Sequence, residues 1–181
     1  MPNNFLSVQV SLDGYVAGPD GDLSWTDVAD AEVDELMAEQ LRDIDAMIFG
    51  HTAYRLVGPY WQDGPTVRAV DREHTRLMNS LPKLVLSRGE PDLFWGPAQR
   101  LGADLPAEVA RLKKGEGDVA VFAGAQAAQA FLPFVDEIRL VIYPVVLGGG
   151  LRLFSAPLGR LSLSGTRTFP ASGVVQLRYV R

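Results

Sequence analysis

Residues 121–154 contain the residue types and spacing that best suit ligand binding. An apolar run ends at residues 123–126 (Ala-Gly-Ala-Gln), where small residues lead into a helical pattern. The first amides of a helix lack partners within the helix, and small residues let a ligand reach the main chain. This turn is therefore a candidate anion site. On these residues alone, however, close packing of a helix against a strand is the better explanation.

Asp30 is the candidate proton donor. Apolar residues recur at helical spacing over residues 27–43 and form one stripe. Asp30 falls near the edge of this stripe, and Asp34 lies further out on the same flank. A carboxyl group at a cleft edge can have a raised pKa and deliver a proton. A capping or solvated aspartate in the first helical turn explains Asp30 equally well, and Asp34 is the second candidate.

Asp13 and Trp25 are candidate substrate contacts. Asp13 opens the glycine-bearing segment 13–21 after the first predicted strand. Aspartates commonly bond their own turn, so that role is as plausible as contact with a ligand. Trp25 follows in a Ser-Trp-Thr-Asp segment that can cap the next helix. Its ring could pack on that helix, form a wall of a substrate pocket, or do both.

Other kinds of site have little support. The chain has two histidines, His51 and His74, and no cysteine, so no spacing typical of a metal site occurs. No G-x-S-x-G segment is present for a nucleophilic serine. The glycine triplet at residues 148–150 matches no phosphate-binding motif. We interpret it as a loop that shapes the fold or as part of a subunit contact.

The composition is that of a globular protein. The 181 residues are 47% hydrophobic and 22% charged, and the net charge of −5 does not favour binding to nucleic acid. We find neither a signal peptide nor an apolar run of about 20 residues that would span a membrane. Together with the absence of cysteine, these features favour a cytoplasmic protein without a membrane or nucleic-acid partner.

The apolar pattern predicts alternating strands and helices that must position these residues. Strands are expected at residues 5–12, 46–50, 83–87, 93–101 (weaker), 119–122, 136–143, 161–169 and 173–181. Helices are expected at residues 27–43, after residue 51, at 67–81, 104–115 and 126–132, with a loop at 59–65.

This order of elements predicts an α/β fold in a single domain spanning residues 1–181. We expect a mostly parallel twisted sheet flanked by helices, with an antiparallel edge formed by the two last strands. Ligands bind such sheets at the carboxyl ends of the strands. Three loops with unusual residues fall there, at residues 13–21, 50–55 and 123–126.

Several segments, in this order along the whole chain, carry a resemblance to a known family. They are SLDGYVAGPDG (11–21), FGHTAY (49–54), KLVLSR (83–88), VFAGA (121–125), VDEI (135–138), PVVLGGG (144–150) and LF (153–154). The chain resembles the dihydrofolate-reductase-like superfamily. It is most similar to the C-terminal reductase domain of the riboflavin-biosynthesis deaminase-reductase and its stand-alone bacterial relatives.

This resemblance implies an NADPH-dependent reductase of a planar nitrogen heterocycle that is pterin-, pyrimidine- or aminouracil-like. The nicotinamide would lie near the first loop, which includes Ala17, and Asp30 would follow Trp25 as the acid does in folate-reducing relatives. The implied cofactor-binding residues at the two helix starts and after the third strand are Gly50, His51, Thr52, Ser87, Arg88, Ala123, Gly124, Ala125 and Gln126.

Two departures from the family pattern leave a second function open. Most relatives carry arginine at the position of His51, and an imidazole offers fewer hydrogen bonds than a guanidinium. Relatives tend to have glycine at the position of Ala123, where the backbone conformation can favour glycine. The alternative is therefore a non-catalytic nucleotide- or flavin-binding module on the same fold. Another reduced cofactor, such as a deazaflavin, is neither supported nor excluded.

The resemblance also implies a homodimer, since relatives are often dimers. The apolar segment 143–147, read as a strand continuing toward the glycine triplet, is the expected contact.

Overall fold

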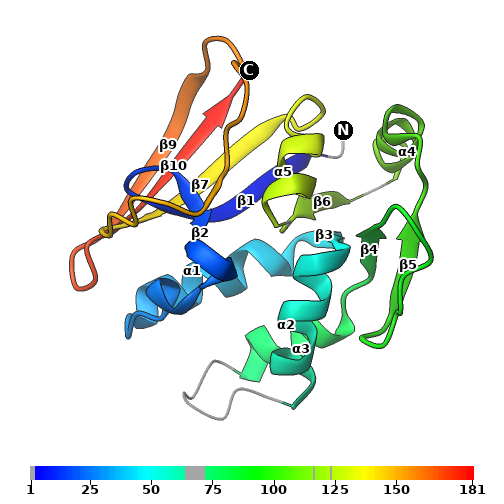
Figure 1. Ribbon diagram of the computed structural model, residues 1–181, viewed down its shortest axis with the longest axis horizontal. Coiled ribbons are helices and arrows are strands. Elements are labelled where there is room, and N and C mark those ends of the chain that lie inside the picture. Colours follow the sequence, from blue (N-terminus) through cyan, green and yellow to red (C-terminus); the bar gives the residue numbers. More distant parts are fainter. Residues whose placement is uncertain (1–2, 64–71, 116, 123) are drawn as a thin grey trace.

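The computed structural model describes residues 3–63, 72–115, 117–122 and 124–181, and within them an eight-stranded sheet forms the centre (Figure 1). The strands of this sheet are β1 (Asn4–Ser11), β3 (Ile44–Gly50), β4 (Lys83–Leu86), β5 (Ala98–Leu101), β6 (Asp118–Val121), β7 (Glu137–Tyr143), β9 (Ser162–Phe169) and β10 (Val174–Val180). A separate two-stranded sheet pairs β2 (Tyr15–Ala17) with β8 (Leu151–Arg152). The α-helices are α1 (Ala31–Arg42), α2 (His51–Asp63), α3 (Arg72–Ser80), α4 (Leu105–Leu112) and α5 (Ala125–Phe131).

The strand order is β5-β4-β3-β6-β1-β7-β10-β9. Pairing is parallel from β5 to β7, and β10 and β9 add an antiparallel edge. The predicted fold class is thereby confirmed. Since β3 and β6 are neighbours, the loops at their carboxyl ends emerge side by side, although the two strands are far apart in the sequence.

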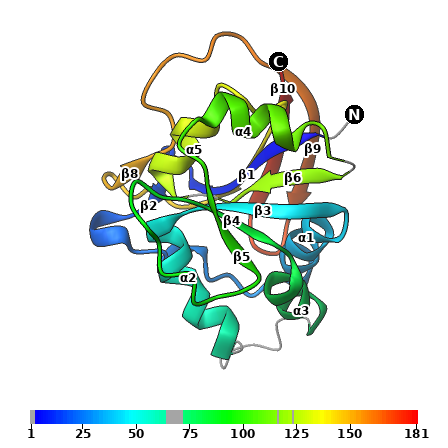
Figure 2. The ribbon, with the colours of Figure 1, turned by 90° about the vertical axis from the view of Figure 1, so that its right-hand side faces the viewer.

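Helices cover both faces of the sheet. The two views place α4 and α5 on one face and α1, α2 and α3 on the other (Figures 1 and 2). On the first face, Ala128 and Phe131 of α5 belong to one apolar cluster with Ile48 and Val121. On the second, Leu41 of α1 and Tyr54 of α2 pack around the sheet in another cluster. Within the described ranges, no helix is long and apolar enough to cross a bilayer.

The first helix begins later than the sequence predicts. Residues 24–26 form a 3-10 turn, and α1 starts at Ala31 with Asp30 as its N-cap. The Asp30 side chain accepts a hydrogen bond of 3.0 Å from the backbone N–H of Glu32. The Ser-Trp-Thr-Asp segment therefore precedes the helix and does not cap it.

The second helix continues through the segment predicted as a loop. Pro59 lies inside α2, which ends at Asp63. In this part of the helix the backbone of Gly58 packs closely on Phe94, so that a Cβ there would lie 2.8 Å from the Phe94 ring. Of the helix expected at residues 67–81, the structure describes α3, and residues 64–71 lie outside the described ranges.

Two further differences concern strands. The predicted strand at residues 93–101 is reduced to β5, since Trp95 instead packs into the core with 1% of its surface exposed. The paired strands β2 and β8 were not predicted, because two or three residues carry no detectable period.

Lys83 is fully buried at the start of β4. Its ammonium donates to the backbone oxygens of Asn79, at 3.1 Å, and Gly96, at 3.4 Å, and lies 4.5 Å from the centre of the Trp95 ring. Burial lowers the pKa of Lys83 to about 8 from an ordinary value of 10.5.

This burial predicts an alkaline gain in stability. Between pH 8 and 10.5 the unfolded chain binds more protons at Lys83 than the folded chain, so the free energy of unfolding rises with pH, by at most ~1.4 kcal/mol per pH unit for one group. Urea unfolding of the wild type and of Lys83→Met at pH 7, 8, 9 and 10 measures this change in the free energy of unfolding. The wild type should gain stability relative to the variant above pH 8, and parallel curves would contradict the assignment.

Candidate functional site

The first turns of α2 and α5 are packed against each other at the carboxyl ends of β3 and β6. A Cβ on Gly50 would lie 3.0 Å from the Cβ of Ala127, and a Cβ on Gly124 would lie 3.3 Å from that of Ala53. The backbone N–H of Phe122 also donates to the oxygen of Ile48 at 2.9 Å, which joins the two strand ends. The unpaired amides of both helix starts therefore belong to one small region.

Glycine is needed in this region for its size. Gly124 is the N-cap of α5 with φ −64° and ψ 168°, which any residue can adopt. The expectation that the backbone at Ala123 favours glycine falls on a residue outside the described ranges. Any larger side chain at Gly50 or Gly124 would press on the opposite helix and separate the two turns.

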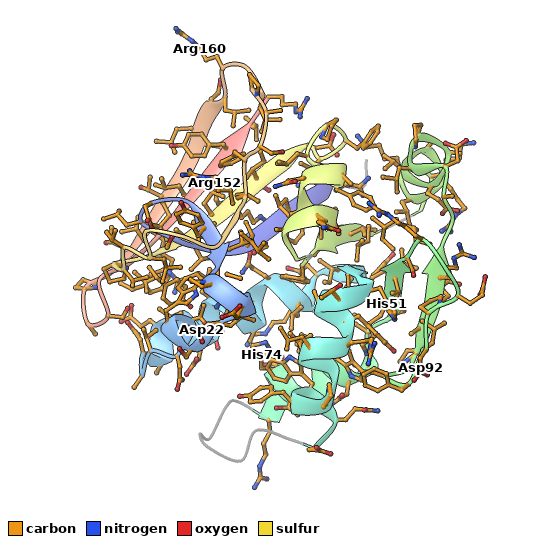
Figure 3. All side chains as sticks on the ribbon, viewed as in Figure 1. Asp22, His51, His74, Asp92, Arg152 and Arg160 are labelled. Carbon is orange, nitrogen blue, oxygen red and sulfur yellow. The ribbon has the colours of Figure 1, made fainter. Side chains whose placement is uncertain are left out.

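His51 is the first residue of α2 and lies at the end of that helix nearest the sheet (Figure 3). Its Nε2 atom is shielded from solvent and has no hydrogen-bond partner among the described residues. A buried polar atom without a partner is costly, and such atoms often mark a place where a ligand completes the bonding. The neighbouring Thr52 is exposed and presents its hydroxyl in the same helical turn.

Ser87 and Arg88 lie next to this region. Leu86, the last residue of β4, pairs with Gly50, so the two residues after it emerge beside the start of α2. Ser87 is half-buried, whereas Arg88 is exposed and forms no ion pair with any described residue. The structure therefore brings a hydroxyl and a guanidinium close to the histidine and the two helix starts.

At the start of α5, the predicted residues have different exposures. Ala125 is buried in the core, and Gln126 is exposed. Ala125 can therefore offer only its backbone to a ligand, and Gln126 can also offer its side chain.

Asp13 holds two distant loops together. Its Oδ1 accepts from the Ser11 hydroxyl at 2.7 Å and from the N–H of Leu147 at 3.1 Å, and its Oδ2 accepts from the N–H of Gly148 at 2.8 Å. Desolvation raises the pKa of Asp13, but the hydrogen bonds from Ser11, Gly148 and Leu147 outweigh it and lower the pKa to about 2. These contacts give Asp13 a structural role, and its contact with a substrate stays a prediction.

The glycine triplet belongs to the same connection. A Cβ on Gly150 would lie 2.1 Å from the backbone oxygen of Ala17, and the φ of Gly150 is +126°, so no other residue fits there. Ala17 pairs with Leu151 in the small sheet. The triplet therefore shapes the fold, which is the first of the two roles predicted for it from the sequence. Tyr143 ends β7 and is buried, so the expected continuation of this strand through residue 147 is wrong. The dimer contact at residues 143–147 stays a prediction.

Trp25 is half-buried above the carboxyl end of β7. Its Nε1 donates to the backbone oxygen of Asp22 at 3.1 Å, and its ring meets the edge of Tyr143 at 5.5 Å between ring centres. The Tyr143 hydroxyl in turn accepts from Gln9 at 2.8 Å. Trp25 is therefore packed on the sheet and on α1, and its role as a pocket wall stays a prediction.

Asp30 and Asp34 have opposite pKa shifts. The pKa of Asp30 is lowered, first by the Ser172 hydroxyl and then by the N–H groups at the start of α1. The raised pKa expected for Asp30 is therefore wrong in direction, because the residue serves as the helix cap. Burial, and then the charge of Asp30, raise the pKa of Asp34. Of the two candidates, Asp34 has the environment that suits a proton donor.

Tyr60 of α2 was not predicted to belong to this region. Burial raises the pKa of its hydroxyl, and the charge of Asp34 raises it further. The two side chains are thus close enough to interact across α1 and α2. Sequence alone gave no sign of this pair, because Tyr60 was placed in a loop.

Comparison with known proteins identifies relatives over the full chain. The sequence matches the family described as RibD C-terminal domain over residues 2–175. The uncharacterized protein YyaP of Bacillus subtilis (strain 168) is 35% identical over 182 residues, which cover 96% of this chain and 92% of YyaP. A second uncharacterized protein of that bacterium, YwjB, is 28% identical and covers 97% of this chain and 96% of its own length.

Solved structures share the fold. A riboflavin biosynthesis-like protein from Shewanella sp. PV-4 superposes with a TM-score of 0.72 at 23% identity, covering 99% of this chain and 98% of the other. Dihydrofolate reductase from Enterococcus faecalis, complexed with NADP(H), gives a TM-score of 0.70 at 13% identity, covering 99% and 96%. At these identities, the likeness establishes the fold alone.

Replacement of Asp13 tests its role in joining the loops. Because the folded pKa is below the ordinary 3.8, this carboxylate stabilises the fold at neutral pH, and the stabilisation is lost as pH falls from about 4 toward 2. Asp13→Asn should therefore lower the unfolding temperature at pH 7 and have little effect at pH 2. Thermal unfolding followed by circular dichroism measures this, and an equal loss at both pH values would contradict it.

Proposed function

The chain belongs to the RibD C-terminal domain family, and we propose that it is an NADPH-dependent reductase of a planar, pterin- or aminouracil-like nitrogen heterocycle. One observation carries the proposal. The buried Nε2 of His51, which has no partner in the part of the chain that the structure describes, lies at the start of a 13-residue helix. The first turn of this helix is packed against a second helix start. This arrangement suits the diphosphate of a dinucleotide.

The residues around the two helix starts fit the cofactor by size and charge. Gly50 and Gly124 keep the backbone accessible, and the start of α2 favours negative charge through its free N–H groups and its dipole. In this proposal His51 and Thr52 bind the diphosphate, and Ser87 and Arg88 bind the 2′-phosphate. A guanidinium without an ion pair to a described residue can make charge-assisted bonds to that phosphate.

The chemistry divides between the cofactor and the chain. When bound, NADPH supplies the hydride. The protein orients the heterocycle near Trp25 and delivers a proton to its ring nitrogen, and Asp34 is the proposed donor because its raised pKa keeps the carboxyl protonated to higher pH than an ordinary aspartate. Asp30 remains ionised as the cap of α1, and its charge is one cause of that raised pKa.

A second function is binding without turnover. It is supported by His51, which places an imidazole where an arginine would offer a forked, permanently charged group to a phosphate. Turnover experiments separate the two functions. Binding of NADPH with no oxidation across a panel of dihydropterins, dihydrofolate and reducible aminouracils would favour the binding module.

Replacement of either glycine by a residue with a larger side chain tests the cofactor site. Gly50→Val and Gly124→Val should each weaken NADPH binding at least tenfold, because the added side chain pushes the two first turns apart. Titration calorimetry with NADPH measures the affinity. Gly149→Val is the matched control, since Gly149 has open space around it and an ordinary φ. Unchanged affinity in both folded site variants would contradict the site.

Separate replacement of Asp34 and Asp30 by asparagine tests which residue donates the proton. The measurement uses a substrate that the wild-type enzyme reduces. Asp34→Asn should lower kcat by about 100-fold, the usual contribution of a general acid. Asp30→Asn retains a capping side chain but removes the charge that raises the pKa of Asp34. The pH dependence of kcat should then shift toward lower pH. Equal kcat values in the wild type and Asp34→Asn would exclude Asp34 as the donor.

A further inference from the structure

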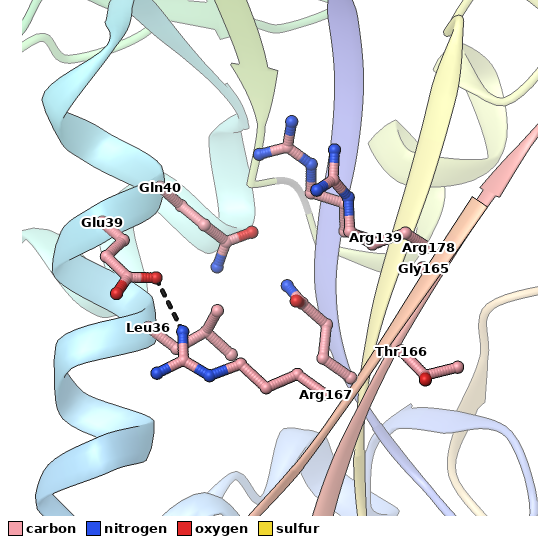
Figure 4. Close-up of a pocket in the computed structure, with 9 residues that line it drawn as sticks. Leu36, Glu39, Gln40, Arg139, Gly165, Thr166, Arg167 and Arg178 are labelled. Carbon is pink, nitrogen blue, oxygen red and sulfur yellow. Dashed lines mark hydrogen bonds and ion pairs between the residues drawn. The ribbon is translucent and has the colours of Figure 1, made fainter.

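A second region of the molecule has the make-up of a ligand site and lies apart from the helix starts. It is a pocket of about 300 Å³ between α1 and the strands β7, β9 and β10 (Figure 4). This volume is at the lower end of the range for small-molecule sites. Its polar lining includes Glu39, Gln40, Arg139, Arg167, Gln176 and Arg178. We call this set the arginine pocket.

The arginine pocket is far from the proposed cofactor site. Arg139 lies near the start of β7 and pairs with Arg178 on β10. Four residues, or about 13 Å of strand, separate Arg139 from Tyr143 at the carboxyl end of β7. At its other end, the lining residue Gln176 pairs with Val141, two residues before Tyr143, so the pocket extends along β7. In the strand order, β1 lies between β7 and the strands β3 and β6 that carry the loops around Gly50 and Gly124.

Arg139 and Arg178 are held in place by one buried carboxylate. Glu137, with 4% of its side chain exposed, accepts from Arg139 at 2.9 and 3.1 Å, from Arg178, and from Asn3 at 3.2 Å. The Arg139 guanidinium also stacks on the Phe5 ring, 3.5 Å from its centre. Glu137 uses one or two nitrogens of each guanidinium, so other N–H groups on both remain to face the pocket.

Gln40 adds a fixed amide from the helix side. Its Oε1 accepts from the Ser7 hydroxyl at 2.6 Å, and both residues are buried. This bond orients the amide so that Nε2 is the free end, and its described contact is a weak one to the sulfur of Met37 at 3.8 Å. Figure 4 shows the Gln40 side chain extending from α1 into the pocket.

Arg167 approaches from β9 on the opposite wall. One of its nitrogens donates to Glu39 at 2.8 Å, drawn as the dashed line in Figure 4. Gly165 on the same strand pairs with Arg178, and its backbone lies beside the Arg178 side chain.

The charges of the pocket do not balance. Three guanidiniums face two carboxylates, Glu39 and Glu137, and Glu137 lies beneath the arginines with its oxygens already bonded. One positive charge and a set of unused N–H donors remain, in a protein whose net charge is −5. A concave, donor-rich wall of this kind attracts anions and binds oxyanions through charge-assisted bonds.

We propose that the arginine pocket binds a small organic oxyanion, a metabolite carrying a phosphate or carboxylate group, through Arg167, Arg178 and the amide of Gln40. The site is separate from the cofactor site. Guanidinium forks match the planar geometry of carboxylates and the oxygens of phosphates equally, so the pocket selects for the oxyanion and for a molecule that fits its volume.

Titrations with inorganic phosphate and with citrate, at constant ionic strength set with chloride, test the proposal. Calorimetry should give saturable binding of at least one of the two at millimolar concentration or below. In NMR spectra, the Nε–H signals of Arg167 and Arg178 should shift on titration and that of Arg111 should not. The probe that binds with the higher affinity indicates whether phosphate or carboxylate is the preferred group.

Variants localise the binding. Arg167→Met and Arg178→Met should each weaken it about tenfold. Arg111→Met is the matched control, because it also removes a guanidinium from an exposed ion pair, that with Glu108 on α4. The NMR readout needs no variant and stands if Arg178→Met fails to fold. Absence of binding at 20 mM, unchanged affinity in folded pocket variants, or loss of binding when NADPH saturates the protein would each overturn the proposal.

Discussion

The contact between the first turns of α2 and α5 is the constraint on which the candidate cofactor site depends. Gly50 packs on Ala127 and Gly124 on Ala53, so each glycine leaves space for an alanine of the other helix. The reciprocal contact brings the amides of both helix starts to the adjacent ends of β3 and β6. It also places the His51 imidazole where its Nε2 is shielded and lacks a partner among the described residues. Packing of small residues and access for a ligand are therefore two consequences of one contact, and they do not compete as explanations.

Other parts of the same edge depend on hydrogen bonds to aspartates. Asp13 joins the loop after β1 to the loop after β7, and Gly150 lets the second loop lie against Ala17. Asp30 caps α1 and satisfies the N–H of Glu32 in the first turn of that helix. Both carboxylates are bonded by N–H or hydroxyl groups, which stabilise their ionised forms. Asp34, one helical turn beyond the cap, is half-buried beside a fixed negative charge and has the opposite shift.

The proposed cofactor site and the arginine pocket have different chemistry. At the carboxyl ends of β3 and β6 the proposed site is built from backbone amides and small residues, with His51 and Arg88 nearby. Between α1 and the C-terminal strands, charged side chains form the wall, and the buried Glu137 orients two of the three guanidiniums. The antiparallel hairpin of β9 and β10 provides the strands on which two of these arginines lie.

The pattern of residues along the chain was enough to predict the fold class and to place the loops around Gly50 and Gly124 at the ends of strands. Alternating strands and helices predict a parallel sheet, and the ordered motifs along the chain identify the family, which the full-length match confirms. The roles of individual side chains, in contrast, follow from contacts that exist only in the folded protein. Asp13 bonds Leu147, 134 residues away, and the arginine pocket assembles from α1, β7 and the hairpin of β9 and β10, three separate parts of the chain. Asp30 and Asp34 differ because of which neighbours desolvate or bond them. Local patterns report which face of an element is buried, but pKa shifts and partners depend on contacts between elements that form only when the chain folds.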